Sequence, residues 1–364
     1  MAGVGCEQGD GTNAAGAAVP AGQGASGGTG RIGYLDWGRA LGCLAIVFLH
    51  VLVTTRLNGD LPSARYAVTL WVDTALTRWG VPVFLMISGA LLLNPQKEMG
   101  LPKLRRYVVR MVCVLATIGF AMAIIESALD AGALSLAVVG EAALHVLEAK
   151  SWGHLWYLYA LIGLYLLTPL FRAFTAHASR QEMRFVLMAC VALVMAVPTA
   201  NIVFDLELTT FYVTLPAAAV YYLLGYYAHT YLSFNRRWAV AGIACALGAA
   251  ALAVLLYYLQ GNATPAYEPE DPLICVYSVA VFLGLRRFLG GVPMGEHPLF
   301  RGIANLSFAI YLVHTVFQHL FVRLVPVAAV PPVAYEAAMF VVSLAGSVAV
   351  AWLLKRLPGF RRWL

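Results

Sequence analysis

Ten separate stretches of this chain are apolar over about 20 residues, the length that a helix needs to cross the hydrocarbon core of a bilayer. The chain is 61% hydrophobic and 12% charged, with a mean hydropathy of +0.77, which excludes an ordinary soluble domain. We therefore predict an all-α polytopic membrane protein with about ten transmembrane helices. The predicted spans lie near residues 34–54, 72–93, 107–127, 154–173, 183–202, 209–229, 238–259, 273–290, 302–322 and 334–354.

Basic residues in the connections predict the orientation of these helices. Sixteen Lys and Arg residues fall in the even-numbered connections and the C-terminal tail, whereas the odd-numbered connections hold only Arg56, Arg65, Arg78, Lys150 and Arg323. Because Lys and Arg are retained on the cytoplasmic side, both termini are predicted to be cytoplasmic. The net charge of +6 is then explained by the basic residues that set the membrane orientation. These residues are spread over five separate segments, which argues against a single nucleic-acid-binding surface.

Composition divides the chain into a leader and one domain. Residues 1–30 are mostly Gly and Ala with almost no large apolar side chain, so we expect a disordered leader. The leader also lacks the apolar core of a secretory signal, so the first helix is expected to act as an uncleaved signal anchor. Residues 31–364 are predicted to form a single ten-helix membrane domain.

The longest external connection, residues 129–153, is semi-apolar and places Glu141, His145 and Glu148 at helical spacing. We expect an amphipathic helix at the outer membrane surface, because three ionisable groups make spanning costly. The alternative is that this stretch spans and another of the ten does not.

The first apolar stretch carries ionisable side chains at two depths. Arg39 and His50 are eleven positions apart, which on a helix is roughly three turns and about 16 Å, so their side chains share one face. Asp36 lies one turn before Arg39. Ionisable residues inside a membrane span are costly and usually mark a functional site. Simpler interpretations remain open: an Asp36–Arg39 pair at the membrane rim, and a histidine at the membrane interface.

The second stretch, TRWGVPVFLMISGALLL, contains Pro82 and the pair Ser88-Gly89. Pro82 is expected to interrupt the backbone hydrogen bonds of this helix. Ser88 falls at the predicted depth of Arg39 and is a candidate to border a cavity. Small residues in membrane helices more often serve close packing, and that interpretation stays open.

Two further stretches place imidazoles near the predicted depth of His50. His154 and Trp156 stand at the outer mouth of the fourth stretch, where an interfacial aromatic belt would explain the indole equally well. Tyr311 and His314 share one face of the ninth stretch. Because two imidazoles are predicted at one level of the membrane, we expect a shared pocket.

No metal site or disulfide framework is predicted. None of the six cysteines forms a CxxC pair, and the motifs GxSxG, HExxH, GxGxxG and the P-loop are absent from the sequence. Three other histidines fall in predicted cytoplasmic connections and are expected to be solvated: His177, His229 and His297.

Four segments, in this order, resemble motifs of the membrane acyltransferase-3 family: LDWGRALGCLAIVFLH, VPVFLMISGALLL, HLWYLYALIGLYLLTPLF and LSFAIYLVH. The resemblance covers nearly the whole chain from about residue 31. The HLWY segment is most similar to the stand-alone branch that includes the enterobacterial common antigen O-acetyltransferase. We expect a member without the additional esterase-like or racemase domains that some relatives carry.

The resemblance implies an integral membrane O-acyltransferase that moves an acyl group, usually acetyl from cytoplasmic acetyl-CoA, to a hydroxyl of an extracytoplasmic glycan. It places the family's paired arginine and histidine on Arg39 and His50, and the serine of its SG motif on Ser88. We expect His50 to act as general base. The CoA phosphates are expected at Arg39 and at the basic second connection, Lys103, Arg105 and Arg106.

Three side chains, Tyr311, His314 and His154, are expected to orient the sugar or stabilise the oxyanion. No bound cofactor is expected, because acetyl-CoA would be a substrate. The expected partners are the bilayer, acyl-CoA and a cell-surface polysaccharide or lipid-linked glycan, with the protein in the bacterial cytoplasmic membrane. A transporter or flippase for a small polar solute or a lipid-linked sugar is the alternative, because buried His, Arg and Asp also build proton relays.

Overall fold

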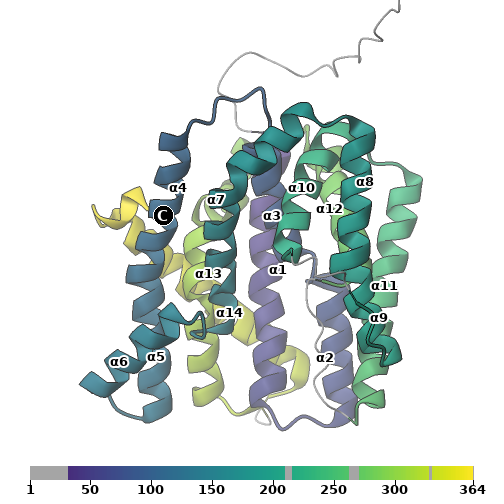
Figure 1. The fold of residues 1–364 in the computed structure, drawn as a ribbon. Helices are drawn as coiled ribbons and strands as arrows, with labels where there is room; N and C mark the ends of the chain where they lie inside the picture. The colour runs from purple at the N-terminus through teal and green to yellow at the C-terminus, as the bar shows by residue number, and fades with distance from the viewer. Residues whose placement is uncertain (1–31, 210–214, 262–269, 328–329, 364) are drawn as a thin grey trace, which may run out of the picture. The chain divides into compact units, whose positions relative to one another are not determined.

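The computed structural model describes residues 32–209, 215–261, 270–327 and 330–363, and within these ranges it contains helices but no strand. Helix α1 (Gly33–Asn58) begins at the top of the view in Figure 1, and the later helices, some of them joined end to end as α2 and α3 are, run up and down beside it. They are α2 (Ser63–Leu76), α3 (Gly80–Leu92), α4 (Leu101–Val114), α5 (Phe120–Ala131), α6 (Leu136–Leu147), α7 (Trp156–His177), α8 (Arg180–Val191), α9 (Val197–Phe204), α10 (Ala217–Tyr231), α11 (Arg236–Leu259), α12 (Pro272–Leu289), α13 (Pro298–Leu324) and α14 (Pro332–Arg356).

Nine helical segments of the described chain are long and apolar enough to cross a membrane. Two of them contain a π-helical turn, η1 (Leu115–Gly119) between α4 and α5 and η3 (Ala192–Ala196) between α8 and α9. The sixth predicted span, 209–229, corresponds to α10, which has 15 residues and follows a segment, 210–214, outside the described residues. The all-α polytopic membrane fold is confirmed, and the orientation of its termini stays a prediction. The predicted leader, residues 1–30, also lies outside the described residues.

The connection 129–153 contains a separate helix, α6, which packs against α5 at the bottom of Figure 1. The Ser135 hydroxyl caps α6 by accepting a hydrogen bond from the backbone N–H of Val138 at 3.3 Å. Its 12 residues cover only about 18 Å, too short to span a bilayer. The alternative in which this stretch spans the membrane was therefore wrong.

The second span differs from its prediction in start and shape. It begins at Ser63 rather than near residue 72, and it is broken between α2 and α3 at residues 77–79. Pro82 lies in the first turn of α3, where a helix leaves backbone N–H groups without partners in any case. A proline removes the hydrogen bond to the carbonyl four residues earlier, here that of Arg78, which lies in the break. The expected interruption by Pro82 is therefore observed as the break between α2 and α3, and the proline itself lies where the new helix starts.

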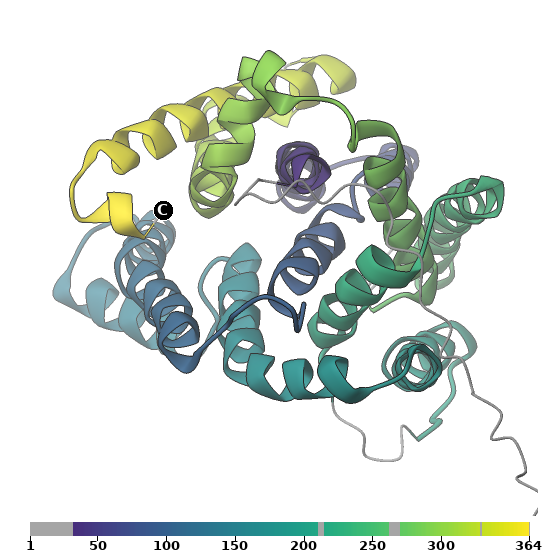
Figure 2. The same ribbon diagram turned by 90° about the horizontal axis from the view of Figure 1, so that it is seen from above.

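Helices α1 and α3 lie near the middle of the bundle when it is seen from above (Figure 2). α3 crosses α10 with the two backbones in direct contact. A Cβ added at Gly89 would lie 1.8 Å from the Tyr222 carbonyl oxygen, and one added at Gly225 would lie 2.0 Å from the Met86 carbonyl oxygen. Only glycine fits at these two positions. α13 packs between α1 and α14, which brings the ninth predicted span against the first.

Candidate active site

Three imidazoles from three helical segments meet beside α1. His50 comes from α1, His314 from α13, and His154 from the short helix η2 (Gly153–Leu155) that leads into α7. The ring centroids are 4.8 Å apart for His50 and His314, 5.2 Å for His154 and His314, and 5.8 Å for His50 and His154. His314 and His154 are buried, whereas His50 is half-buried. We call these three residues the histidine cluster.

Hydrogen bonds in the histidine cluster determine which nitrogen of His50 is basic. His314 Nδ1 lies 2.7 Å from the Tyr311 carbonyl oxygen, so this nitrogen carries the hydrogen and donates it. In the neutral ring, His314 Nε2 then has a lone pair, and it lies 3.1 Å from His50 Nδ1. His50 Nδ1, which is also 2.9 Å from the Ile46 carbonyl oxygen, must therefore carry its ring's hydrogen. The lone pair of His50 is left on Nε2.

Neighbouring helices hold the histidine cluster in place. The Tyr311 hydroxyl donates to the backbone carbonyl of His154, and the Ser343 hydroxyl of α14 donates to the backbone carbonyl of His314 at 3.0 Å. Gln318, one turn after His314, donates through Nε2 to the Val47 carbonyl of α1 at 3.1 Å. These contacts tie α13 to α1, η2 and α14 at the level of the imidazoles.

Aromatic side chains connect the histidine cluster with Arg39. The Tyr157 ring lies 5.4 Å from the Tyr311 ring, and the Tyr157 hydroxyl interacts with the hydroxyl of Ser88. Tyr157 and Tyr165, both on α7, lie within Coulombic range of the Arg39 guanidinium. Ser88 and Arg39 thus border the same group of tyrosines, as their predicted depths required.

Arg39 also forms the ion pair that its spacing from Asp36 predicts. Arg39 Nη1 lies 2.9 Å from Asp36 Oδ1, and the Arg39 side chain keeps 34% of its surface exposed. Asp36 is buried and fixes one side of the guanidinium. This contact orients the remaining nitrogens of Arg39. The Asp36–Arg39 ion pair is therefore compatible with a role of Arg39 in binding a ligand.

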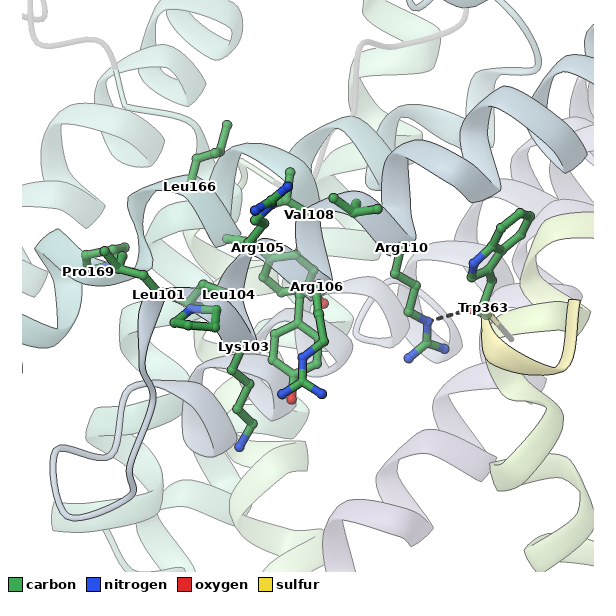
Figure 3. A pocket seen from close by; sticks show the side chains of 14 residues that line it. Leu101, Lys103, Leu104, Arg105, Arg106, Val108, Arg110, Leu166, Pro169 and Trp363 are labelled. Atoms are coloured by element: carbon green, nitrogen blue, oxygen red, sulfur yellow. Dashed lines mark hydrogen bonds between the residues drawn. The ribbon is translucent and has the colours of Figure 1, made fainter. Parts of the chain in front are cut away.

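A pocket of about 1190 Å³ lies along α4 from Leu101 to Arg110. It contains the three predicted cations Lys103, Arg105 and Arg106. Figure 3 shows Lys103 and Arg106 extending to one side of α4, whereas Arg105 extends to the other. The remaining lining residues are Leu101, Pro102, Leu104, Tyr107, Val108, Val109, Arg110, Tyr165, Leu166, Pro169 and Trp363. We call it the basic pocket. Tyr165 belongs both to this pocket and to the tyrosines near Arg39.

Trp156 and His229 do not have the surroundings that the sequence predicted for them. Trp156 is 38% exposed and contacts the Tyr157 ring at 6.3 Å, and no described contact joins it to the histidine cluster. His229 was expected to be solvated, but the structure contradicts this. It is half-buried, with Nδ1 2.5 Å from the Tyr34 hydroxyl, because the end of α10 packs against α1 and α12.

A buried ionic group beside the histidine cluster was missed. Asp73 Oδ2 lies 2.6 Å from Arg56 Nη2 and 2.7 Å from Arg78 Nη2, and the Thr77 hydroxyl donates to Asp73 Oδ1 at 2.6 Å. Asp73 and Arg78 act electrostatically on His50. Arg56 and Arg78 had been counted as loop residues, but Arg56 lies within α1 and Arg78 in the break before α3. The signal available in the sequence was an Asp inside an apolar stretch.

Metal ligation is not indicated in the described ranges, which hold no group of three or more His, Cys, Asp or Glu side chains placed to bind one ion. The three rings of the histidine cluster instead meet edge to face, at interplanar angles of 62° to 73°. The arrangement suits transfer of a proton between a ring nitrogen and a bound group.

Comparison with known proteins gives one match. A family model described as an acyltransferase domain matches residues 32–352. A comparison with curated proteins found no match, and a comparison with solved structures also found none. The matched range contains the histidine cluster, Arg39, Ser88 and the cations of α4, but it ends before Trp363.

Proposed function

This chain belongs to the membrane acyltransferase-3 family, and from that premise we propose that it is an O-acetyltransferase acting on an extracytoplasmic glycan. The donor would be cytoplasmic acetyl-CoA and the acceptor a hydroxyl of a cell-surface polysaccharide or lipid-linked sugar in the bacterial cytoplasmic membrane. The observation that carries the proposal is a series of polar and charged groups in which each lies near the next. It runs from the basic pocket through Tyr165, Arg39 and Tyr157 to the histidine cluster.

The basic pocket and Arg39 provide the charges that an acyl-CoA requires. Lys103, Arg105 and Arg106 would bind the phosphates, since guanidinium and ammonium groups are strong donors to phosphate oxygens. Arg39, oriented by Asp36, would hold the donor further along the path. Ser88 and the Tyr157 hydroxyl, which interact with each other near Arg39, would be polar partners for the amides of a pantetheine arm.

His50 would activate the acceptor. Its Nε2 lone pair takes the proton from the sugar hydroxyl while the hydroxyl oxygen forms a bond to the thioester carbonyl carbon. The carbon–sulfur bond then breaks, and the CoA thiolate takes the proton from His50. His314 keeps the hydrogen of His50 on Nδ1, and Tyr311 acts as a positioning residue because its hydroxyl is bound to the His154 carbonyl.

The test of this function is acetyl transfer by purified protein supplied with labelled acetyl-CoA and a surface-glycan extract from cells that lack the gene. His50→Ala is expected to reduce transfer by roughly 10²–10⁴-fold, the usual contribution of a positioned base. Arg39→Ala is expected mainly to raise the KM for acetyl-CoA. His145→Ala, on α6 and paired with Glu141 at 3.8 Å, is the matched control and should retain activity.

Full activity of His50→Ala, in protein of normal stability, would contradict the proposed mechanism. A wild-type protein that neither releases CoA nor acetylates the extract would instead favour the transporter or flippase alternative. In that case uptake of a labelled sugar into sealed vesicles is the next measurement. The stand-alone O-acetyltransferase branch stays a prediction, and the mass of the acylated sugar fragments tests it.

A further inference from the structure

The basic pocket has aromatic lining residues, of which Trp363 lies outside the family match. Trp363 follows the short helix η6 (Phe360–Arg362) and lines the pocket together with Tyr107 and Tyr165. In Figure 3, Trp363 lies beyond Arg110 at the end of the row of cations on α4. The indole is half-buried, so part of its surface remains accessible.

The position of Trp363 is fixed by α4. Arg110 Nε donates a hydrogen bond of 2.5 Å to the Trp363 carbonyl oxygen, drawn as a dashed line in Figure 3. The same guanidinium lies over the Phe308 ring of α13, with its carbon 5.5 Å from the ring centroid. Arg110 therefore joins α4, α13 and the C-terminal segment, and the Phe360 ring packs edge to face against the indole at 6.0 Å.

Spacing along α4 explains what the pocket can recognise. Lys103, Arg106 and Arg110 are three and four residues apart, so they share one face over about 10 Å. A row of cations binds phosphate groups, and an indole binds the face of a planar base. Phosphates joined to a planar base make a nucleotide.

We propose that Trp363 stacks on the nucleobase of the acyl donor while Lys103 and Arg106 bind its phosphates. Arg110 is a positioning residue that holds Trp363 through its backbone carbonyl. This inference rests on the proposed function and assigns the nucleotide end of acyl-CoA to a site shared by α4 and the C-terminal segment.

A membrane-surface anchor is the competing explanation, because Trp, Arg and Lys also bind lipid headgroups. Two observations favour the nucleotide. Tyr165 lines the basic pocket and also lies within Coulombic range of Arg39 on α1, so the pocket adjoins the inner helices of the bundle. The Trp363 carbonyl oxygen also accepts a hydrogen bond from Arg110 in the pocket wall, which holds this residue beside the cations. A headgroup anchor requires neither feature.

The experiment measures equilibrium binding of labelled CoA and of pantetheine to purified full-length protein, without any acceptor. Trp363→Ala is expected to raise the Kd for CoA by about 5- to 150-fold, the range that corresponds to loss of one stacked base. Trp363→Phe should restore most of the affinity, because it keeps an aromatic face. The Kd for pantetheine, which has no base, should not change. Adenosine 3′,5′-bisphosphate should compete with CoA in the wild type and less well in Trp363→Ala.

Trp352→Ala is the matched control, because this indole is 50% exposed on α14, packs under Arg356 and does not line the basic pocket. Its CoA affinity should equal that of the wild type. An unchanged CoA Kd in Trp363→Ala would overturn the inference, and so would an equal rise for CoA and pantetheine. Failure of the proposed function is a separate result: CoA and adenosine 3′,5′-bisphosphate would bind as described, but no acetyl transfer would occur.

Discussion

Asp73 keeps its charge inside the bundle because charged and polar partners surround it. The carboxylate is fully buried, and Arg56, Arg78 and Thr77 all contact it. Arg56 is itself buried, and its Nη1 has no hydrogen-bond partner among the described residues. A buried carboxylate shared by two guanidinium groups is stable only while all three charges are present.

Asp73→Asn is expected to lower the free energy of unfolding by about 3–5 kcal/mol, since it leaves the buried cation of Arg56 beside the half-buried cation of Arg78 without the anion. The measurement is thermal unfolding of purified protein in detergent. Glu148→Gln is the control: Glu148 pairs with Lys150 at 2.8 Å on the exposed end of α6, where ion pairs contribute little. Equal melting temperatures for the two variants would contradict the structural role of Asp73.

Depth along a helix was sufficient to predict which imidazoles meet, because a helix has a fixed rise per residue. His50 and His314 were expected at one level, and the structure places their nitrogens 3.1 Å apart. Depth could not reveal Asp73 or Gln318. Their burial depends on partners from distant segments: Arg56 reaches Asp73 across the α1–α2 turn, and Gln318 reaches α1 from α13.

At the scale of helices, the crossing of α3 and α10 depends on two glycines. The contact places Gly89 against the Tyr222 carbonyl and Gly225 against the Met86 carbonyl. Ser88, the neighbour of Gly89, is thereby left to face Tyr157. The packing and cavity interpretations of Ser88-Gly89 are therefore compatible, because each residue serves one of them.

Gly89→Ala is expected to destabilise the protein by about 1–3 kcal/mol or more, because its Cβ would lie 1.8 Å from a carbonyl oxygen and the helices would have to separate. Gly163→Ala on α7 is the matched control, since an added Cβ there meets nothing within 4 Å. Replacing a helical glycine without a clash is neutral or stabilising. Comparable melting temperatures for the two variants would show that the helices tolerate separation.

Helix boundaries were predicted less well than helix number. Hydropathy placed the start of the second span near residue 72, because Asp60, Ser63 and Arg65 make the preceding turns look polar. In the structure Arg65 is paired with Glu336 at 3.9 Å, and the helix extends back to Ser63. A hydropathy window counts charged residues but takes no account of the ion pairs that they form in the folded protein.

At the scale of the whole molecule, the bias of basic residues predicts which end of the bundle faces the cytoplasm. Cysteines introduced at Glu148 and His177 test this, because both positions are exposed and α7 separates them by about 33 Å. With Cys6 replaced by serine, a membrane-impermeant maleimide should label position 148 in intact cells. Position 177 should react only after permeabilisation. Labelling of position 177 in intact cells would contradict a cytoplasmic location of both termini.

The backbone contact between α3 and α10 also limits how the protein can move. Where two main chains touch at Gly89 and Gly225, no flexible side chain lies between them to absorb sliding or rotation. α3 and α10 are therefore expected to move together as one rigid pair of helices. Any helix movement that admits a bulky substrate or releases a product has to occur in the surrounding helices. The α3–α10 pair meanwhile keeps Ser88 at a constant depth in the bundle.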